Sequence, residues 1–205
     1  MIDGVRGSKG EGVTRTEWFE RGLVTGVGRV SGGILAGGFA SLAASSPSRS
    51  QDVTSLNFAL GYEELQAAFY AQALRDGFLR GQWLQFAQTV ATHERAHVAY
   101  LRQTLGGAAQ PSPRFELKRP PASLGEFSRM AVVLEDIGVA LYDGQAGNLT
   151  ARGLAVAAEI MSVESRHASW ARAIAGELPA PVASDVPADA AQVRAQLAGA
   201  GVGIV

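Results

Sequence analysis

The chain has 205 residues, with 18 Lys and Arg against 19 Asp and Glu, a formal net charge of −1, and a hydrophobic fraction of 47%. This composition is too apolar for a disordered chain, and the balanced charge offers nucleic acid no basic surface. The absence of cysteine excludes disulfides, thiolate zinc sites, iron–sulfur clusters and a cysteine nucleophile. Any chemistry must therefore use carboxylates, the three histidines, hydroxyl groups or the backbone.

Residues 1–51 differ from the rest and indicate a signal-like, Gly-rich tail with a polar linker. The segment Thr14–Phe19 is similar to a twin-arginine export motif, except that Thr16 stands in place of the second arginine. The small residues Ser41 and Ala43 suit cleavage after Ala43. The Gly and Ser content is too high for a stable transmembrane anchor. We expect export to the periplasm or cell envelope, with a flexible tail on a cytoplasmic protein as the alternative.

Beyond this tail, apolar residues recur every three or four positions, which is typical of helices packed on one face. The first two predicted helices cover about 53–75 and 82–105. The third opens at Ser123, whose S-x-x-E pattern with Glu126 forms a capping box. A polar turn region over 144–153 separates it from the fourth.

The fourth predicted helix places Leu154 and Ala158 on its inward face and ends before a proline pair. Since no segment alternates apolar and polar residues between hairpin turns, we expect no sheet. The predicted fold is all-α, a four-helix bundle over 52–178 made of two helical hairpins, followed by a C-terminal arm over 179–205. The hairpins need a long crossover, and 106–122, at about 3.3 Å per extended residue, can run the length of the bundle.

Each predicted helix carries a glutamate in the middle of its apolar face. Burying a carboxylate without a partner costs several kcal/mol, so four such residues need a common explanation. Two of them begin Glu-x-x-His pairs, whose members lie on one helical face because they are three residues apart. Four carboxylates and two imidazoles are the ligand set of a dimetal site in a bundle, and we expect the two single glutamates to bridge the metals. The six candidate metal ligands are Glu63, Glu94, His97, Glu135, Glu164 and His167.

An internal repeat supports this set. The distance from Glu63 to Glu94 is 31 positions, and from Glu135 to Glu164 it is 29. A second acid follows each single glutamate directly, a tyrosine follows it by seven positions, and an arginine follows each Glu-x-x-His glutamate by eight. These matched residues are Glu64 and Asp136, Tyr70 and Tyr142, and Arg102 and Arg172. The repeat predicts two similar hairpins related by a pseudo-twofold axis.

Other residues near the set have alternative interpretations. Tyr70 and Tyr142 are interpreted as core residues with a nearby hydrogen bond, or as partners of the ligands or radical sites. Glu64 and Asp136 are solvated charges or partners of the ligands, and Glu64 replaces Glu63 if the predicted register is off by one. The third histidine, His93, points about 100° away from Glu94 around the helix and is interpreted as a surface residue or as a neighbour of the ligands.

At these residues the chain resembles the ferritin-like domain proteins, which include plant desiccation-related proteins and bacterial exported relatives. The resemblance covers about 52–178 and implies a ferritin-like four-helix bundle with the same six residues in the dimetal ligand positions. Gln66 and Ala68 stand where the family often has further acids, which argues against additional metal binding there. The segments that carry the resemblance are Leu56–Leu60 with Glu63, His93–His97, Leu134–Val139 and Val163–His167.

Oxygen and nitrogen ligands without sulfur favour two iron ions, or manganese. Six protein ligands for two metals leave coordination positions open for O2 or peroxide. The predicted function is oxidation of Fe(II) or removal of peroxide in stress protection, with metal ions and O2 or peroxide as partners and no nucleic acid. The alternative is a structural, desiccation-stress protein of the envelope in which the metal only adds stability. A homo-oligomer, including an iron-storage cage, is a further expectation that one sequence does not test.

Overall fold

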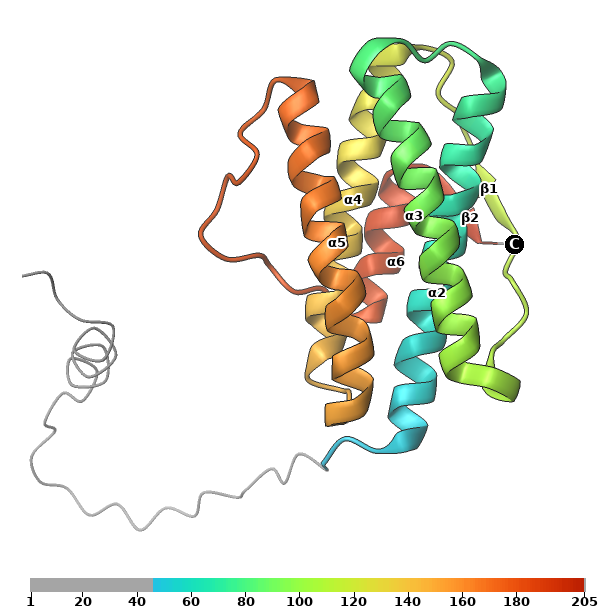
Figure 1. The fold of residues 1–205 in the computed structure, drawn as a ribbon, viewed down its shortest axis with the longest axis vertical. Helices are drawn as coiled ribbons and strands as arrows, with labels where there is room; N and C mark the ends of the chain where they lie inside the picture. Colours follow the sequence, from blue (N-terminus) through green and yellow to red (C-terminus); the bar gives the residue numbers. More distant parts are fainter. Residues whose placement is uncertain (1–45, 205) are drawn as a thin grey trace, which may run out of the picture. The chain divides into compact units, whose positions relative to one another are not determined.

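The computed structural model describes residues 46–204, and its centre is a bundle of four long helices (Figure 1). The expected export motif and cleavage site lie outside the described residues. No helix in the described range is both long and apolar enough to cross a membrane. The helices are α2 (Arg49–Asp76), α3 (Gly81–Leu105), α4 (Leu124–Ala146), α5 (Ala151–Ala175) and the shorter α6 (Ala190–Gly199). Short elements are the 3-10 helix η1 (Gly106–Ala108) and the strands β1 (Phe115–Leu117) and β2 (Val202–Ile204).

Side-chain caps set the starts of α2 and α4. Ser48 caps α2 and forms a capping box with Gln51. The predicted start of α4 is confirmed, because the hydroxyl of Ser123 accepts a hydrogen bond from the backbone N–H of Glu126 at 3.3 Å. The Glu126 carboxylate reaches one residue further back than in a standard capping box and accepts from the N–H of Ala122 at 2.8 Å.

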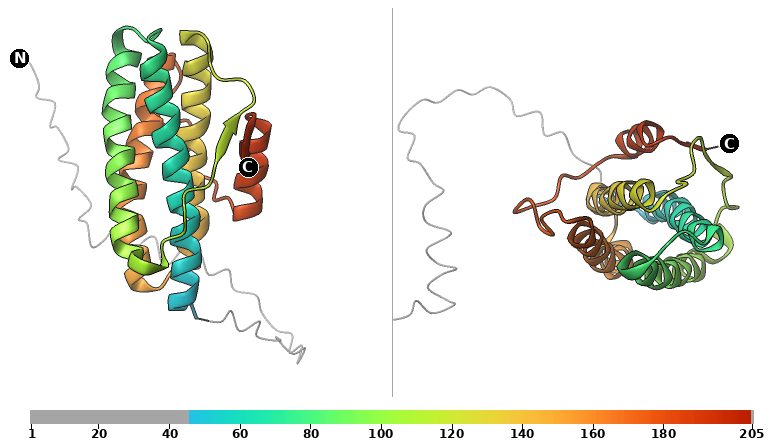
Figure 2. Two further views of the ribbon diagram at one scale, coloured as in Figure 1. Left: turned by 90° about the vertical axis from the view of Figure 1, so that its right-hand side faces the viewer. Right: turned by 90° about the horizontal axis from the view of Figure 1, so that it is seen from above.

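The bundle consists of two helical hairpins, as predicted. Helices α2 and α3 form the first, and α4 and α5 form the second, whose connecting turn covers 147–150 and is shorter than the predicted 144–153. Viewed along the bundle, α2 lies next to α4 and α3 lies next to α5 (Figure 2). The crossover after η1 runs along the outside of the bundle from one end to the other (Figure 2). This arrangement brings the two Glu-x-x-His helices side by side.

The expectation of no sheet is wrong, because β1 of the crossover pairs antiparallel with β2 near the C-terminus. Leu117 lies opposite Val202 in this two-stranded ribbon. Strands of three residues are too short to produce a visible alternation in the sequence. The adjoining α6 packs on α4 and buries Val193 and Leu197 in the core. Residues after position 181 therefore contribute to the packing of the bundle.

The inward face predicted for α5 is wrong in its N-terminal part and right further along, where Glu164, His167 and Ala171 are buried. Leu154 is 41% exposed and Ala158 is also exposed, whereas the buried face begins at Gly153. A Cβ atom at Gly153 would lie 2.5 Å from a carboxylate oxygen of Asp52 on α2. That carboxylate accepts hydrogen bonds from the backbone N–H of Thr150 at 2.8 Å and from its hydroxyl at 2.6 Å. Because α5 approaches α2 this closely, glycine occupies the buried position and a larger apolar side chain has no room there.

Candidate metal centre

The six predicted ligands converge in the middle of the bundle. The four glutamates are 0% exposed, His167 is 3% exposed and His97 is 9% exposed. The six residues form two overlapping groups. Each residue of a group offers one donor atom, and within each group these atoms lie within 4.8 Å of one another. The first group is Glu63, Glu94, His97 and Glu164, and the second is Glu94, Glu135, Glu164 and His167. The structure thus brings all six residues together as two adjacent groups that share Glu94 and Glu164.

His97 faces three carboxylates. Its Nδ1 atom lies 3.1 Å from Oε2 of Glu63, 3.1 Å from Oε2 of Glu94 and 3.3 Å from Oε1 of Glu164. These carboxylates come from α2, α3 and α5, so the imidazole sits where three helices meet. The first group is therefore a compact set of one nitrogen and three oxygen donors.

His167 has the equivalent surroundings in the second hairpin. Its Nδ1 atom lies 3.2 Å from Oε1 of Glu94 and 3.5 Å from both Oε2 of Glu135 and Oε1 of Glu164. Glu94 therefore presents a separate oxygen to each imidazole. This geometry favours Glu94 and Glu164, instead of the expected Glu63 and Glu135, as the residues shared by the two groups. Because α3 and α5 lie side by side, their own glutamates reach both histidines, and the single glutamates each face only one.

Two tyrosines hold the single glutamates from across the hairpins. The hydroxyl of Tyr70 on α2 donates to Glu135 on α4, and the hydroxyl of Tyr142 on α4 donates to Oε1 of Glu63 on α2 at 2.5 Å. Burial, together with these carboxylates, raises the pKa of both tyrosines well above its usual value. Both hydroxyls therefore keep their protons and remain donors. The structure therefore supports the interpretation of Tyr70 and Tyr142 as partners of the ligands, because both hydroxyls contact candidate ligands directly.

The second acids pair with arginines outside the cluster. Arg102 forms an ion pair with Glu64, and Arg172 lies 2.6 Å from Asp136. Glu64 also accepts a hydrogen bond from the hydroxyl of Ser112 at 2.9 Å. Glu64 thus points away from the metal centre, which excludes the alternative register in which it replaces Glu63. The arginines and acids that correspond in the sequence repeat therefore form one equivalent ion pair within each hairpin.

Two further polar residues border the cluster. Nδ1 of His93 lies 2.8 Å from Nε2 of His167, and the planes of the two rings are nearly parallel, at an angle of 15°. Burial and the other two histidines lower the pKa of His93. On the other side, Gln66 is fully buried, and in the described part of the chain neither atom of its amide has a hydrogen-bond partner. Its counterpart in the repeat is Gly138, where a Cβ would lie 2.9 Å from Oε2 of Glu164.

Protons balance the charge of the metal-free cluster. Burial, reinforced by the nearby charge of Glu94, raises the pKa of Glu63 to about 8. Burial also raises the pKa of Glu135 to about 8. Burial alone would lower the pKa of His97 and His167, but the carboxylates around each imidazole raise both values to about 12. A cluster that holds protons this firmly has an excess of negative charge that cations can neutralise.

Unpartnered donor atoms show that the residues fit a metal. Buried polar atoms are nearly always hydrogen-bonded, and each unpaired one is costly. In the described residues, five donor atoms of the cluster have no hydrogen-bond partner: Oε1 of Glu94, Oε2 of Glu135, both carboxylate oxygens of Glu164 and Nδ1 of His167. All are oxygen or nitrogen atoms of the kind that coordinate iron or manganese. The cluster could therefore hold metal ions.

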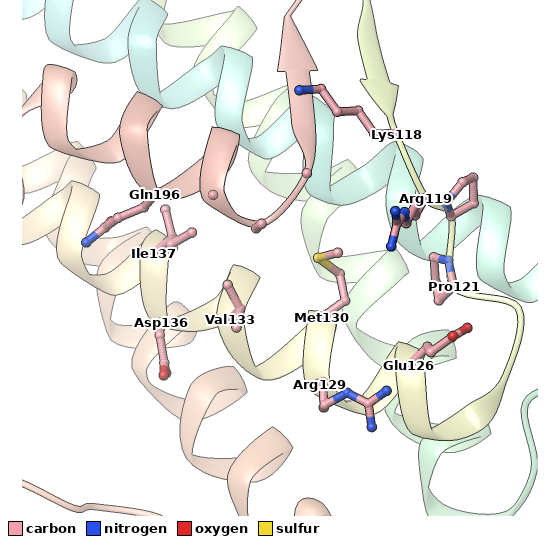
Figure 3. A pocket seen from close by; sticks show the side chains of 14 residues that line it. Lys118, Arg119, Pro121, Glu126, Arg129, Met130, Val133, Asp136, Ile137 and Gln196 are labelled. Atoms are coloured by element: carbon pink, nitrogen blue, oxygen red, sulfur yellow. The ribbon is translucent and has the colours of Figure 1, made fainter.

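Five surface cavities lie away from this cluster. A groove of about 820 Å³ lies on the outer side of α4, between the crossover and the turn after α6 (Figure 3). Met130 and Val133 line it together with Arg119 and Arg129 (Figure 3). This groove and four others, down to about 310 Å³, include none of the six cluster residues in their walls. None of these cavities offers a bulky organic molecule a place beside the cluster.

Comparisons with known proteins agree with this architecture. The model of a family described as ferritin-like domain matches residues 51–177, more than half of the chain. A search of curated proteins finds no match. The matched range covers all four long helices almost completely and contains all six cluster residues.

Proposed function

Because the chain belongs to the ferritin-like domain family, we propose that its six buried Glu and His residues hold two iron or manganese ions and that the protein oxidises Fe(II) or removes peroxide. The observation that carries this proposal is the pair of ligand groups that share Glu94 and Glu164. Two ligand groups that share two carboxylates could hold two cations close together. Four carboxylate charges also match the charge of two divalent cations.

The donor set supports iron or manganese in particular. Carboxylates and imidazoles suit both metals, and the chain offers no thiolate that would favour softer ions. A bound iron or manganese pair would supply the change of oxidation state that Fe(II) oxidation or peroxide removal needs. Fe(II) and O2 or peroxide are the substrates in this proposal. Their small size agrees with a cluster that none of the five surface cavities reaches.

The chain's own residues orient the ligands and exclude water. Tyr142 and Tyr70 donate hydrogen bonds to Glu63 and Glu135, so each single glutamate keeps one oxygen for the metal side. The four glutamates are fully buried, which keeps bulk water away from the charges of the site. Among the six, His97 has the largest exposed fraction, at 9%, so the approach for ions and small oxidants runs past its ring. An enclosed site of this kind supports the proposed redox function.

An alternative function follows from the same burial. A metal pair enclosed this completely can also act only as a cross-link between helices, in a structural protein that protects the envelope under stress. Export by the N-terminal segment and assembly into homo-oligomers are further proposals that rest on the sequence. Light scattering on the purified protein separates monomers and dimers from a many-subunit cage.

A ligand variant and a matched control test the metal site. We expect Glu164→Ala to abolish binding of two metals per chain, because Glu164 belongs to both ligand groups. The control is Glu159→Ala, which removes an exposed acid from the same helix. Metal content is measured after equilibrium dialysis against Fe(II) or Mn(II). Two metals retained in Glu164→Ala would contradict the proposed site.

Oxygen consumption distinguishes the redox function from the structural one. Anaerobic protein receives a small excess of Fe(II) and then O2 or H2O2, and consumption of the oxidant is followed over time. The redox proposal predicts consumption well above buffer in the wild-type protein and at buffer level in Glu164→Ala. A wild-type protein that binds two metals but consumes no oxidant above buffer would favour the structural function.

A further inference from the structure

The two hairpins match at most positions around the cluster but differ immediately before the Glu-x-x-His glutamates. His93 precedes Glu94 on α3, whereas Val163 precedes Glu164 on α5. The tyrosine–glutamate hydrogen bonds and the arginine–acid ion pairs occur in both halves. The histidine therefore breaks a symmetry that these hydrogen bonds and ion pairs keep.

His93 contacts only one of the two candidate histidine ligands through a hydrogen bond. Its Nδ1 atom lies 2.8 Å from Nε2 of His167, and the ring planes are nearly parallel, at an angle of 15°. In the described part of the chain, Nε2 of His97 has no hydrogen bond to another residue, and the corresponding neighbour is Val163. The outer nitrogen of His167, Nε2, is thus held by His93, whereas His97 forms its hydrogen bonds only through Nδ1, to Glu63 and Glu94.

The orientation of the rings decides the direction of this hydrogen bond. Nδ1 of His167 faces three carboxylates, so it is the nitrogen available to a metal. With Nδ1 bound, Nε2 keeps its hydrogen and donates it to Nδ1 of His93. Such a partner on the outer nitrogen fixes the tautomer and the ring orientation of a ligating histidine and increases its basicity.

We propose that His93 is a positioning residue for His167, so that the two metal positions are inequivalent and the position built on His167 binds a divalent cation more tightly than the one built on His97. This inference rests on the proposed dimetal site and adds a difference between its two halves. His93 is exposed and does not fill the core, so replacing it leaves the packing of the bundle intact.

The test exchanges the differing residues between the hairpins. His93→Val copies the second hairpin into the first, and Val163→His makes the reverse exchange. Metal-free wild-type and variant proteins are titrated with Co(II), whose visible spectrum reports coordination, and each stepwise affinity is fitted. We expect two unequal affinities in the wild-type protein. His93→Val should weaken the tighter one by on the order of 10-fold to 100-fold, and Val163→His should strengthen the weaker one.

Two results overturn the inference. One is equal affinity at both positions of the wild-type protein, and the other is unchanged affinities in His93→Val. Circular dichroism of each variant confirms that the helical content is retained. A loss of affinity caused by general loosening of the bundle would weaken both positions alike, which also contradicts the inference.

A second readout requires no metal. Nitrogen-15 NMR of the metal-free protein should show a coupling across the hydrogen bond between Nε2 of His167 and Nδ1 of His93, and His93→Val should remove it. If the wild-type protein binds two Co(II) ions but shows no such coupling, the positioning role fails and the proposed function stands. If it binds no Co(II), the proposed function itself fails.

Discussion

Loading the metal-free protein with two divalent cations should release about four protons per chain at pH 7 and about two at pH 9. At pH 7, Glu63 and Glu135, each with a pKa of about 8, hold nearly one proton apiece. His97 and His167, each with a pKa of about 12, hold one excess proton apiece at both pH values. Metal coordination needs all four groups deprotonated, so these protons leave when the metals bind. At pH 9 the two carboxyl groups have already lost theirs.

The release is measured by adding Mn(II) to metal-free protein in weak buffer with a pH indicator dye. Calorimetric titrations in buffers of different ionisation enthalpy give the same number independently. Since protons are products of the binding reaction, the apparent affinity for the metal must rise with pH over this range. The Glu164→Ala variant serves as the control and should show only a small release, because it lacks a ligand of both groups. The reasoning is refuted if metals bind without releasing protons, or if the release is equal at pH 7 and pH 9.

Three further predictions concern stability. In the metal-free protein, folding raises the pKa of Glu63 and Glu135 above the ordinary 4.5 and that of His97 and His167 above the ordinary 6.5. These four groups therefore bind more protons in the folded than in the unfolded protein, so the free energy of unfolding should fall from about pH 5 to pH 9. Urea denaturation at several pH values measures this decrease. Metal at about 100 times its Kd should raise the unfolding free energy by about 2.7 kcal/mol, seen as a higher Tm that a chelator reverses. Gly144→Ala should lower the denaturation midpoint, since its Cβ would lie 1.9 Å from the backbone oxygen of Ala188, whereas Gly147→Ala has open space and should change it little. An unchanged midpoint in Gly144→Ala would show that the segment before α6 does not pack as described.

The bundle and the six cluster residues could be predicted because their signals are local. Apolar residues every three or four positions define a helix from its own backbone geometry. Glutamates within such faces are conspicuous because an unpartnered buried carboxylate is costly. The Glu-x-x-His spacing places Glu94 with His97, and Glu164 with His167, on one face of each helix. The sequence alone therefore determined the all-α bundle and the six residues of the cluster.

Contacts between elements were decided only by the tertiary structure. Whether Glu63 or Glu94 faces both histidines depends on how neighbouring helices are rotated relative to one another. The helical period of a sequence segment gives no information about this rotation. The inward face of α5 follows from the close approach of Asp52 to Gly153, and the pairing of β1 with β2 joins segments far apart in the chain. The contact between His93 and His167 is of the same kind, because it crosses from α3 to α5. Local periodicity fixes which residues share a helix face, whereas the packing of one helix against another fixes which faces meet.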